Sequence, residues 1–372
     1  MQFIKNGPDI PERLLQKHKE GQVVFFCGAG ISRPMLPDFG GLAKRLYQYL
    51  QVTPNVIQQH ALKAEQYDIA IGLLEQDHVG GRVEVRKALA DILLDYEDSP
   101  KVTATHEALL TLGQCRDDKL RLVTTNFDRH FQDAAARKEI DINTFQAPLL
   151  PVPKKRWDGL VYLHGLLPLN PTENDLDYLV ASSGDFGLAY LTERWAARFI
   201  SELFRNYLVC FIGYSINDPV MRYMMDALAA DHQRGETNFE MFAFGNYKKG
   251  KRSESEEEWC AKNVTPILYK HTQDHVYLHK TLCIWADKYH AGVRGKEQIV
   301  VQEAIGNPLM VTKEDDFVGR VLWAISDKSG LPAKRFAELD PAPTLDWLNP
   351  LNDLYVFQIH PKAKEDRELV LV

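Results

Sequence analysis

The stretch Val23-Val24-Phe25-Phe26-Cys27-Gly28-Ala29-Gly30-Ile31-Ser32 is an apolar run that breaks into a glycine-rich turn. A short continuous apolar run bounded by such a turn is typical of a strand buried on both faces of a parallel sheet. Glycine lacks a Cβ atom, so the backbone of the turn can approach a ligand closely. The amides that follow can then donate to phosphate oxygens. This stretch therefore predicts a strand that ends at a diphosphate-binding turn.

Further apolar runs along the chain have the same composition. The predicted strands are Val23–Cys27, Leu120–Thr124, Leu160–Leu163, Leu208–Ile212, Met241–Phe244 and Pro266–Tyr269. Helical patterns separate most of them, which predicts an α/β fold with a mostly parallel sheet of about six strands. Ligands of such sheets bind beyond the carboxyl ends of the strands. The residues that follow the predicted strands are therefore the candidates for a functional site.

The 372 residues are enough for one large domain or two ordinary ones. Repeated Ala, Leu and charged residues over about 42–100 predict a helical insertion. The composition changes after the turn signal Gly306-Asn307-Pro308. We predict a main domain over 1–295 and a C-terminal extension, or the start of a further domain, over 296–372. The apolar end Leu369–Val372 indicates that the chain is cut from a longer one.

The composition excludes several classes of function. The net charge of -7 gives no basic footprint for nucleic acid. No window approaches the ~20 apolar residues of a membrane span, and the N-terminus lacks a signal peptide, so we expect a cytoplasmic protein. The cysteines are scattered and never in Cys-x-x-Cys spacing, which argues against a disulfide framework and a four-cysteine zinc module. They are Cys27, Cys115, Cys210, Cys260 and Cys283.

Three later motifs follow predicted strands in the same way as the first turn. They are Thr124-Thr125-Asn126-Phe127-Asp128, Tyr162-Leu163-His164-Gly165 and Phe211-Ile212-Gly213-Tyr214-Ser215-Ile216-Asn217-Asp218-Pro219. In this order the four motifs resemble the NAD-binding domain of sirtuins, and most of all the sirtuin-like NAD hydrolases of bacterial anti-phage defence. The resemblance covers about residues 15–290. It implies a Rossmann-like sirtuin fold and NAD+ as the substrate.

The resemblance implies catalytic roles for Asn126 and His164. Cleavage of the nicotinamide–ribose bond builds positive charge on the sugar in an oxocarbenium-like transition state. The carboxamide of Asn126 can hold a water and the ribose hydroxyls because it offers both a donor and an acceptor. An imidazole titrates near neutrality, so His164 is expected to accept a proton from a hydroxyl.

The remaining motif residues acquire binding roles from the same resemblance. We expect Gly28, Ala29 and Gly30 to lie at the diphosphate and adenosine, and Gly213 and Ser215 to lie at the adenosine half. Asp38 and Phe39 are expected in a loop over the nicotinamide end. Ser32 is expected to bind phosphate or cap a helix, and Asp128 to lie near the carboxamide or cap a helix. Asn217 and Asp218 are expected to precede a helix over 220–228. Two departures weaken the nicotinamide-side contacts: the loop after Ser32 is one residue short, and Gly40 stands where many sirtuins have Arg.

Four potential metal ligands recur every four residues, namely His271, His275, His279 and Cys283. Each four-residue step overshoots a helical turn by roughly 40°, so all four cannot face one ion. We therefore predict no metal site. The pattern instead predicts a helix that buries Tyr277, Leu278, Leu282 and Trp285.

The predicted activity is NAD+ glycohydrolysis, giving nicotinamide and ADP-ribose. The resemblance implies that it depletes NAD+ in anti-phage defence. It also implies a homo-oligomer, a tetramer or larger, under the control of a phage-derived or co-encoded protein activator.

Three alternative functions stay open. An NAD-dependent protein deacylase would normally carry the missing zinc cysteines. A non-catalytic sensor of NAD or ADP-ribose would not need both Asn126 and His164. A dehydrogenase would have a G-x-G-x-x-G turn.

Overall fold

The computed structural model describes residues 1–96, 100–115, 117–215, 219, 221–225 and 240–359. The chain divides into two compact units, one formed by Glu12–His279 and the other by Met1–Pro11 with Lys280–Val372. The sequence predicted a domain boundary near residue 295. The predicted cap residues Asn217 and Asp218 and the apolar end Leu369–Val372 lie outside the described residues.

The larger unit is built on a seven-stranded, all-parallel sheet of order β3-β4-β2-β1-β5-β6-β7. Its strands are β1 (Val23–Cys27), β2 (Arg121–Thr124), β3 (Thr144–Gln146), β4 (Gly159–Tyr162), β5 (Leu208–Ile212), β6 (Met241–Tyr247) and β7 (Thr265–Lys270). All residues of β1, β2, β4 and β5 are buried, as expected for strands covered on both faces. The predicted α/β fold with a mostly parallel sheet is confirmed.

The prediction missed strand β3. This edge strand has three residues, and Thr144 and Gln146 are exposed. A strand this short and this polar carries no apolar run, so periodicity cannot detect it. Pairing with the buried strand β4 makes it a strand.

Helices accompany the sheet in the same unit: α1 (Glu12–Lys19), α6 (Pro100–Gly113), α7 (His130–Arg137), α10 (Trp195–Asn206) and α12 (Arg252–Cys260). Helix α10 buries Phe199, Ile200 and Leu203, which join the core that contains Phe26 and Phe211. This three- and four-residue spacing is that of an amphipathic helix. The left-handed backbone of Arg194, with φ 59°, separates α10 from the preceding turn.

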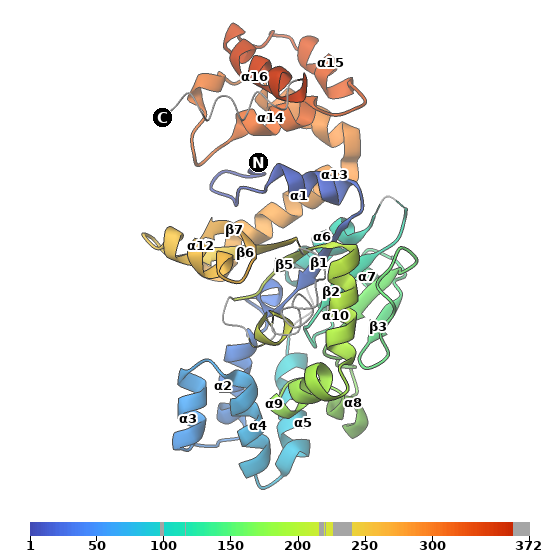
Figure 1. Cartoon of the computed structure of the whole chain (residues 1–372), viewed down its shortest axis with the longest axis vertical. Helices are drawn as coiled ribbons and strands as arrows, with labels where there is room; N and C mark the ends of the chain where they lie inside the picture. The colour runs from blue at the N-terminus through green and yellow to red at the C-terminus, as the bar shows by residue number, and fades with distance from the viewer. Residues whose placement is uncertain (97–99, 116, 216–218, 220, 226–239, 360–372) are drawn as a thin grey trace. The chain divides into compact units, whose positions relative to one another are not determined.

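A helical subdomain lies in the connection from β1 to β2 (Figure 1). It contains α2 (Phe39–Tyr49), α3 (Val56–Lys63), α4 (Tyr67–Asp77) and α5 (Gly81–Leu94). The core of these helices also takes up Leu167, Leu176 and Leu179, which follow strand β4. The shorter elements of the unit are η1 (Ala29–Ser32), α8 (Glu173–Asp177), α9 (Ser183–Phe186), the π-helical turn η2 (Gly187–Thr192) and η3 (Gln273–His275). The insertion is therefore packed against the segment after β4.

The smaller unit is helical. Its elements are the part of α13 (Val276–Glu303) from Lys280 onward, η4 (Pro308–Met310), α14 (Phe317–Ile325), α15 (Leu331–Ala337), η5 (Leu345–Trp347) and α16 (Leu348–Ile359). Trp347 is buried at the centre of its core, with the rings of Phe317 and Phe336 edge-on at 6.2 and 5.6 Å. Nowhere in the described part of the chain is a helix long and apolar enough to cross a membrane.

The predicted helix through His271 and Cys283 is wrong in its first part. His271 directly follows strand β7, and Asp274 and His275 have φ of 56° and 53°, which a helix does not accommodate. Only His279 and Cys283 lie on α13. Among the described residues, no group of three or more His, Cys, Asp or Glu is placed to hold a metal ion.

Candidate functional site

Two neighbouring hollows lie where the sheet's central strands end. The smaller is a cavity of about 50 Å³. The larger is a cleft of about 530 Å³. Ala29 and Phe39 line both, so the two hollows adjoin at these residues.

The structure brings the sequence-predicted residues to these hollows. The cavity is lined by Ala29, Ser32, Phe39, Asn126, Asp128 and His164. The cleft is lined by Ala29, Gly30, Asp38, Phe39, Gly213 and Ser215. Gly28 lines neither of them. Asn126 and His164 meet in one cavity because β2 and β4 are parallel neighbours in the sheet and end at the same edge.

The Asn126 carboxamide is held by Ser32. The Nδ2 atom of Asn126 donates to the Ser32 hydroxyl oxygen at 3.1 Å. That hydroxyl donates to Oδ2 of Asp128 at 2.8 Å, and Asp128 accepts the backbone N–H of His130 at 3.1 Å. Asp128 therefore holds the start of α7 from the residue before the N-cap, which is Arg129 and not Asp128 as predicted. Ser32 is buried and caps no helix, because its hydroxyl is used between Asn126 and Asp128.

His106 completes this arrangement from helix α6, with its Nε2 atom 3.3 Å from the Ser32 hydroxyl oxygen. No pattern in the sequence predicted a role for His106. It lies inside a helix, away from every strand end and motif, so nothing in the local sequence marks it.

His164 is almost completely buried. Its Nε2 atom lies 2.9 Å from the hydroxyl oxygen of Tyr190, and the ring of Phe186 stands edge-on at 5.2 Å. Burial lowers the pKa of His164 to about 3, against a smaller opposing effect of Asp185. The expectation of an imidazole that titrates near neutrality is therefore wrong. At physiological pH this side chain is neutral.

The buried histidines predict a loss of stability in acid. The pKa of His164 is about 3, and burial lowers that of His279 to about 4, against about 6.5 in the unfolded chain. Below pH 6.5 the unfolded chain therefore takes up protons that the folded chain does not. We expect the free energy of unfolding to fall as the pH drops from 7 towards 4, by up to ~1.4 kcal/mol per pH unit for each histidine.

Urea unfolding at pH 7, 6 and 5 measures this slope. The variant His164→Gln is expected to reduce it. The variant His60→Gln, at an exposed position of α3, is the control and should leave it unchanged. A slope that is the same in all three proteins would contradict the assignment to His164.

The glycines of the first turn allow the loops after β1 and β5 to pack closely against each other. The Gly28 amide donates to the Ile212 carbonyl oxygen at 2.8 Å, and the Gly30 amide donates to that of Gly213 at 2.9 Å. A Cβ atom on Gly30 would lie 2.9 Å from the Cα atom of Gly213. These two amides are used within the protein, so they are not the phosphate donors that the sequence analysis expected.

The cleft carries charges of both signs at its mouth. Arg33 pairs with Asp38, and Asp38 also caps α2 by accepting the Gly41 amide at 2.7 Å. Lys251 pairs with Glu254 at 2.9 Å. Asp38 lines the cleft rather than the cavity, and Phe39 lines both. Of the predicted Pro-Asp-Phe loop, Pro37 and Phe39 face the cavity that also contains Asn126 and His164.

A family model described as a SIR2-like domain matches residues 120–267, which carry Asn126, His164, Gly213 and Ser215. The chain contains a SIR2-like domain. The predicted sirtuin-like family is thereby confirmed over these residues. In the described structure the matched segment runs from the start of β2 into β7.

The chain is also similar to a curated relative, the uncharacterized protein y4cA of Sinorhizobium fredii (strain NBRC 101917 / NGR234). The two are 29% identical over 343 residues, which cover 87% of this chain and 27% of that protein. The chain thus spans about a quarter of the length of the relative.

Proposed function

We propose that this SIR2-like domain is an NAD+ glycohydrolase that cleaves the nicotinamide–ribose bond and yields nicotinamide and ADP-ribose. One observation carries the proposal: Asn126 and His164 line the same small cavity, beside a cleft lined by Gly30, Gly213 and Ser215. The cavity would take the nicotinamide riboside half of the dinucleotide. The cleft would take the diphosphate and the adenosine.

Hydrolysis of NAD+ would need few groups besides Asn126 and His164. The bond between C1′ of the ribose and N1 of nicotinamide breaks, and its electron pair stays on the nitrogen, so nicotinamide leaves as a neutral molecule. A water oxygen bonds to C1′ and loses a proton. Asn126 would hold the water or a ribose hydroxyl, and the neutral His164 imidazole would receive the proton.

The low pKa makes His164 a weak base, but it keeps the imidazole neutral when NAD+ binds. A protonated imidazole in the cavity would repel the cationic nicotinamide ring, whereas a neutral one does not. Apolar side chains complete the lining of the cavity, including Leu93, Val180 and Phe186. They would exclude water other than the attacking molecule and so protect the charged sugar of the transition state.

The biological setting is a further part of the proposal, and it follows from the resemblance to the sirtuin-like NAD hydrolases of anti-phage defence. The enzyme would deplete NAD+ in an infected cell. It would act in the cytoplasm as a homo-oligomer under the control of a phage-derived or co-encoded protein. Such control is required because a permanently active enzyme would kill its host.

The product pattern of the purified chain tests the activity. We expect nicotinamide and ADP-ribose to form in equal amounts from NAD+, at the same rate with and without an acetyl-lysine peptide. Nicotinamide release that requires the peptide would instead indicate a deacylase. Saturable binding of NAD+ or ADP-ribose without any nicotinamide release, both with and without candidate activator proteins, would indicate a sensor. Either result would contradict the proposed function.

A further inference from the structure

The side chains that hold His164 belong to two very short helical segments. Phe186 ends helix α9, which has 4 residues, and Tyr190 lies in η2, which has 6. The Tyr190 hydroxyl lies 2.9 Å from Nε2 of His164, and the ring centroid of Phe186 lies 5.2 Å from that of the imidazole. Helices of this length are unstable in isolation. Contacts from elsewhere in the unit must therefore fix their position.

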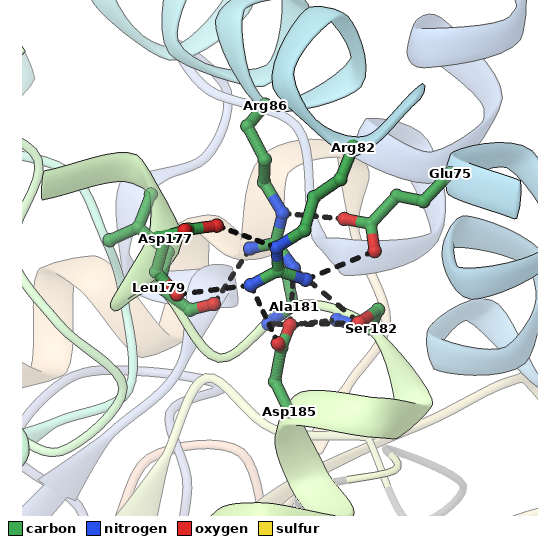
Figure 2. A network of polar contacts seen from close by, with 8 residues as sticks. All are labelled: Glu75, Arg82, Arg86, Asp177, Leu179, Ala181, Ser182 and Asp185. Carbon is green, nitrogen blue, oxygen red and sulfur yellow. Dashed lines mark hydrogen bonds and ion pairs between the residues drawn. The ribbon is translucent and has the colours of Figure 1, made fainter. Parts of the chain in front are cut away.

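Asp185 connects this segment to the helical insertion (Figure 2). Its carboxylate accepts the backbone amides of Ala181 at 3.0 Å and Ser182 at 2.8 Å, which closes the turn before α9. The same carboxylate accepts Nη2 of Arg82 at 2.8 Å and pairs with Arg86. Burial opposes ionisation of Asp185, but the two guanidinium groups and the Ser182 amide outweigh it, and its pKa is lowered. The carboxylate is therefore a charged anchor.

Arg86 is the most buried member of this network, with a side chain that is 1% exposed. Its Nε atom donates to Oε1 of Glu75 on α4 at 2.5 Å, and its Nη1 atom donates to the Leu179 carbonyl oxygen at 2.6 Å. With the bond to Asp185, one planar guanidinium joins α4, α5 and the segment before α9. The rigid fork of arginine makes several such bonds at once, which the point charge of lysine does not.

A second link reaches the same aromatic side chains from α4. The ring of Tyr223 stacks on that of Phe186, with centroids 4.9 Å apart and planes 10° from parallel. The Tyr223 hydroxyl donates to Oδ2 of Asp68 on α4 at 3.2 Å, and Asp68 is fully buried. The insertion thus touches the surroundings of His164 through two separate polar contacts.

We propose that Arg86 is a positioning residue for His164, acting through Asp185 on the segment that carries Phe186 and Tyr190. The helical insertion, rather than the sheet alone, then sets where the imidazole lies in the cavity. The kinetic consequence rests on the proposed function. The structural consequence does not, because the protection of His164 from solvent can be measured without NAD+.

The experiment compares Arg86→Gln with Lys87→Gln, which removes a charge from the next, exposed position of the same helix. Diethyl pyrocarbonate modifies accessible neutral imidazoles, and peptide mass spectrometry reports the modification rate of each histidine. We expect His164 to be protected in the wild type and in Lys87→Gln, and to react severalfold faster in Arg86→Gln. Exposed His60 serves as the internal reference in all three proteins.

A kinetic measurement separates positioning from binding. Arg86→Gln is expected to lower kcat for nicotinamide release by about 10–100-fold with a smaller change in KM, because the cleft that would bind the adenosine half is untouched. If the wild type releases no nicotinamide even with candidate activator proteins, the proposed function fails, and the modification rates still decide the positioning role.

The modification rate of His164 decides whether Arg86 positions it. His164 that stays as protected in a folded Arg86→Gln protein as in the wild type shows that Arg86 does not position it. If Arg86→Gln does not fold, Arg86→Lys replaces it, since it keeps the charge but not the fork. An increase in the modification of His164 supports the role, and an unchanged rate rejects it.

Discussion

Asn126→Ala is expected to lower the rate of nicotinamide release by roughly 10²–10³-fold, because the variant loses the polar group that would hold the attacking water or the ribose hydroxyl. His164→Ala is expected to lose a similar factor, since the cavity then lacks its proton acceptor. Both side chains line the 50 Å³ cavity, so neither substitution should disturb binding in the separate cleft. The measurement is nicotinamide formation at saturating NAD+.

The matched control for this pair is Asn143→Ala. Asn143 is exposed just before strand β3 and lines neither hollow. Its loss should change the rate less than twofold or so, within the usual range of surface substitutions. If Asn126→Ala and His164→Ala release nicotinamide as fast as Asn143→Ala does, then neither Asn126 nor His164 takes part in the mechanism.

Gly213→Ala is expected to destabilise the larger unit by about 2–4 kcal/mol, combining backbone strain with a steric clash. Gly213 has φ +78°, and a Cβ atom there would lie 2.8 Å from the Gly28 carbonyl oxygen and 2.8 Å from the Ile31 amide nitrogen. Neither neighbour is a flexible side chain, so the two loops at the ends of β1 and β5 would have to separate. Urea unfolding of the variant measures the effect.

Gly250→Ala isolates the conformational part of this effect. Gly250 has a comparable φ of +81°, but a Cβ atom there would meet nothing within 4 Å. We expect it to cost only about 1 kcal/mol. Equal destabilisation by the two alanines would show that the contact between the two loops is unimportant, and that strain alone accounts for Gly213.

The sheet was largely predictable because its central strands are continuous apolar runs. The predicted bounds of β1 and β5 agree with the structure residue for residue. Burial on both faces leaves no alternative environment for such a run, so the local sequence is sufficient. The edge strand β3 was missed because its existence depends on pairing with β4, and its own residues are mostly exposed.

The surroundings of the site were not predictable in the same way. The contact between His164 and Tyr190 joins residues 26 apart, and that between Arg86 and Asp185 joins residues 99 apart. Neither Arg86 nor Tyr190 belongs to a motif or follows a strand. Only the packing of the helical insertion against the segment after β4 brings these side chains together.

The sequence by itself determined which residues end the buried strands, and therefore that Asn126 and His164 would reach one edge of a parallel sheet. The tertiary structure alone decided the state of these residues. His164 is neutral because the surrounding protein removes it from water, and the glycines at the ends of β1 and β5 are required because two loops pack at less than 3 Å from where a Cβ atom would stand. Desolvation and close packing depend on neighbours that are distant in the chain, so no local pattern records them.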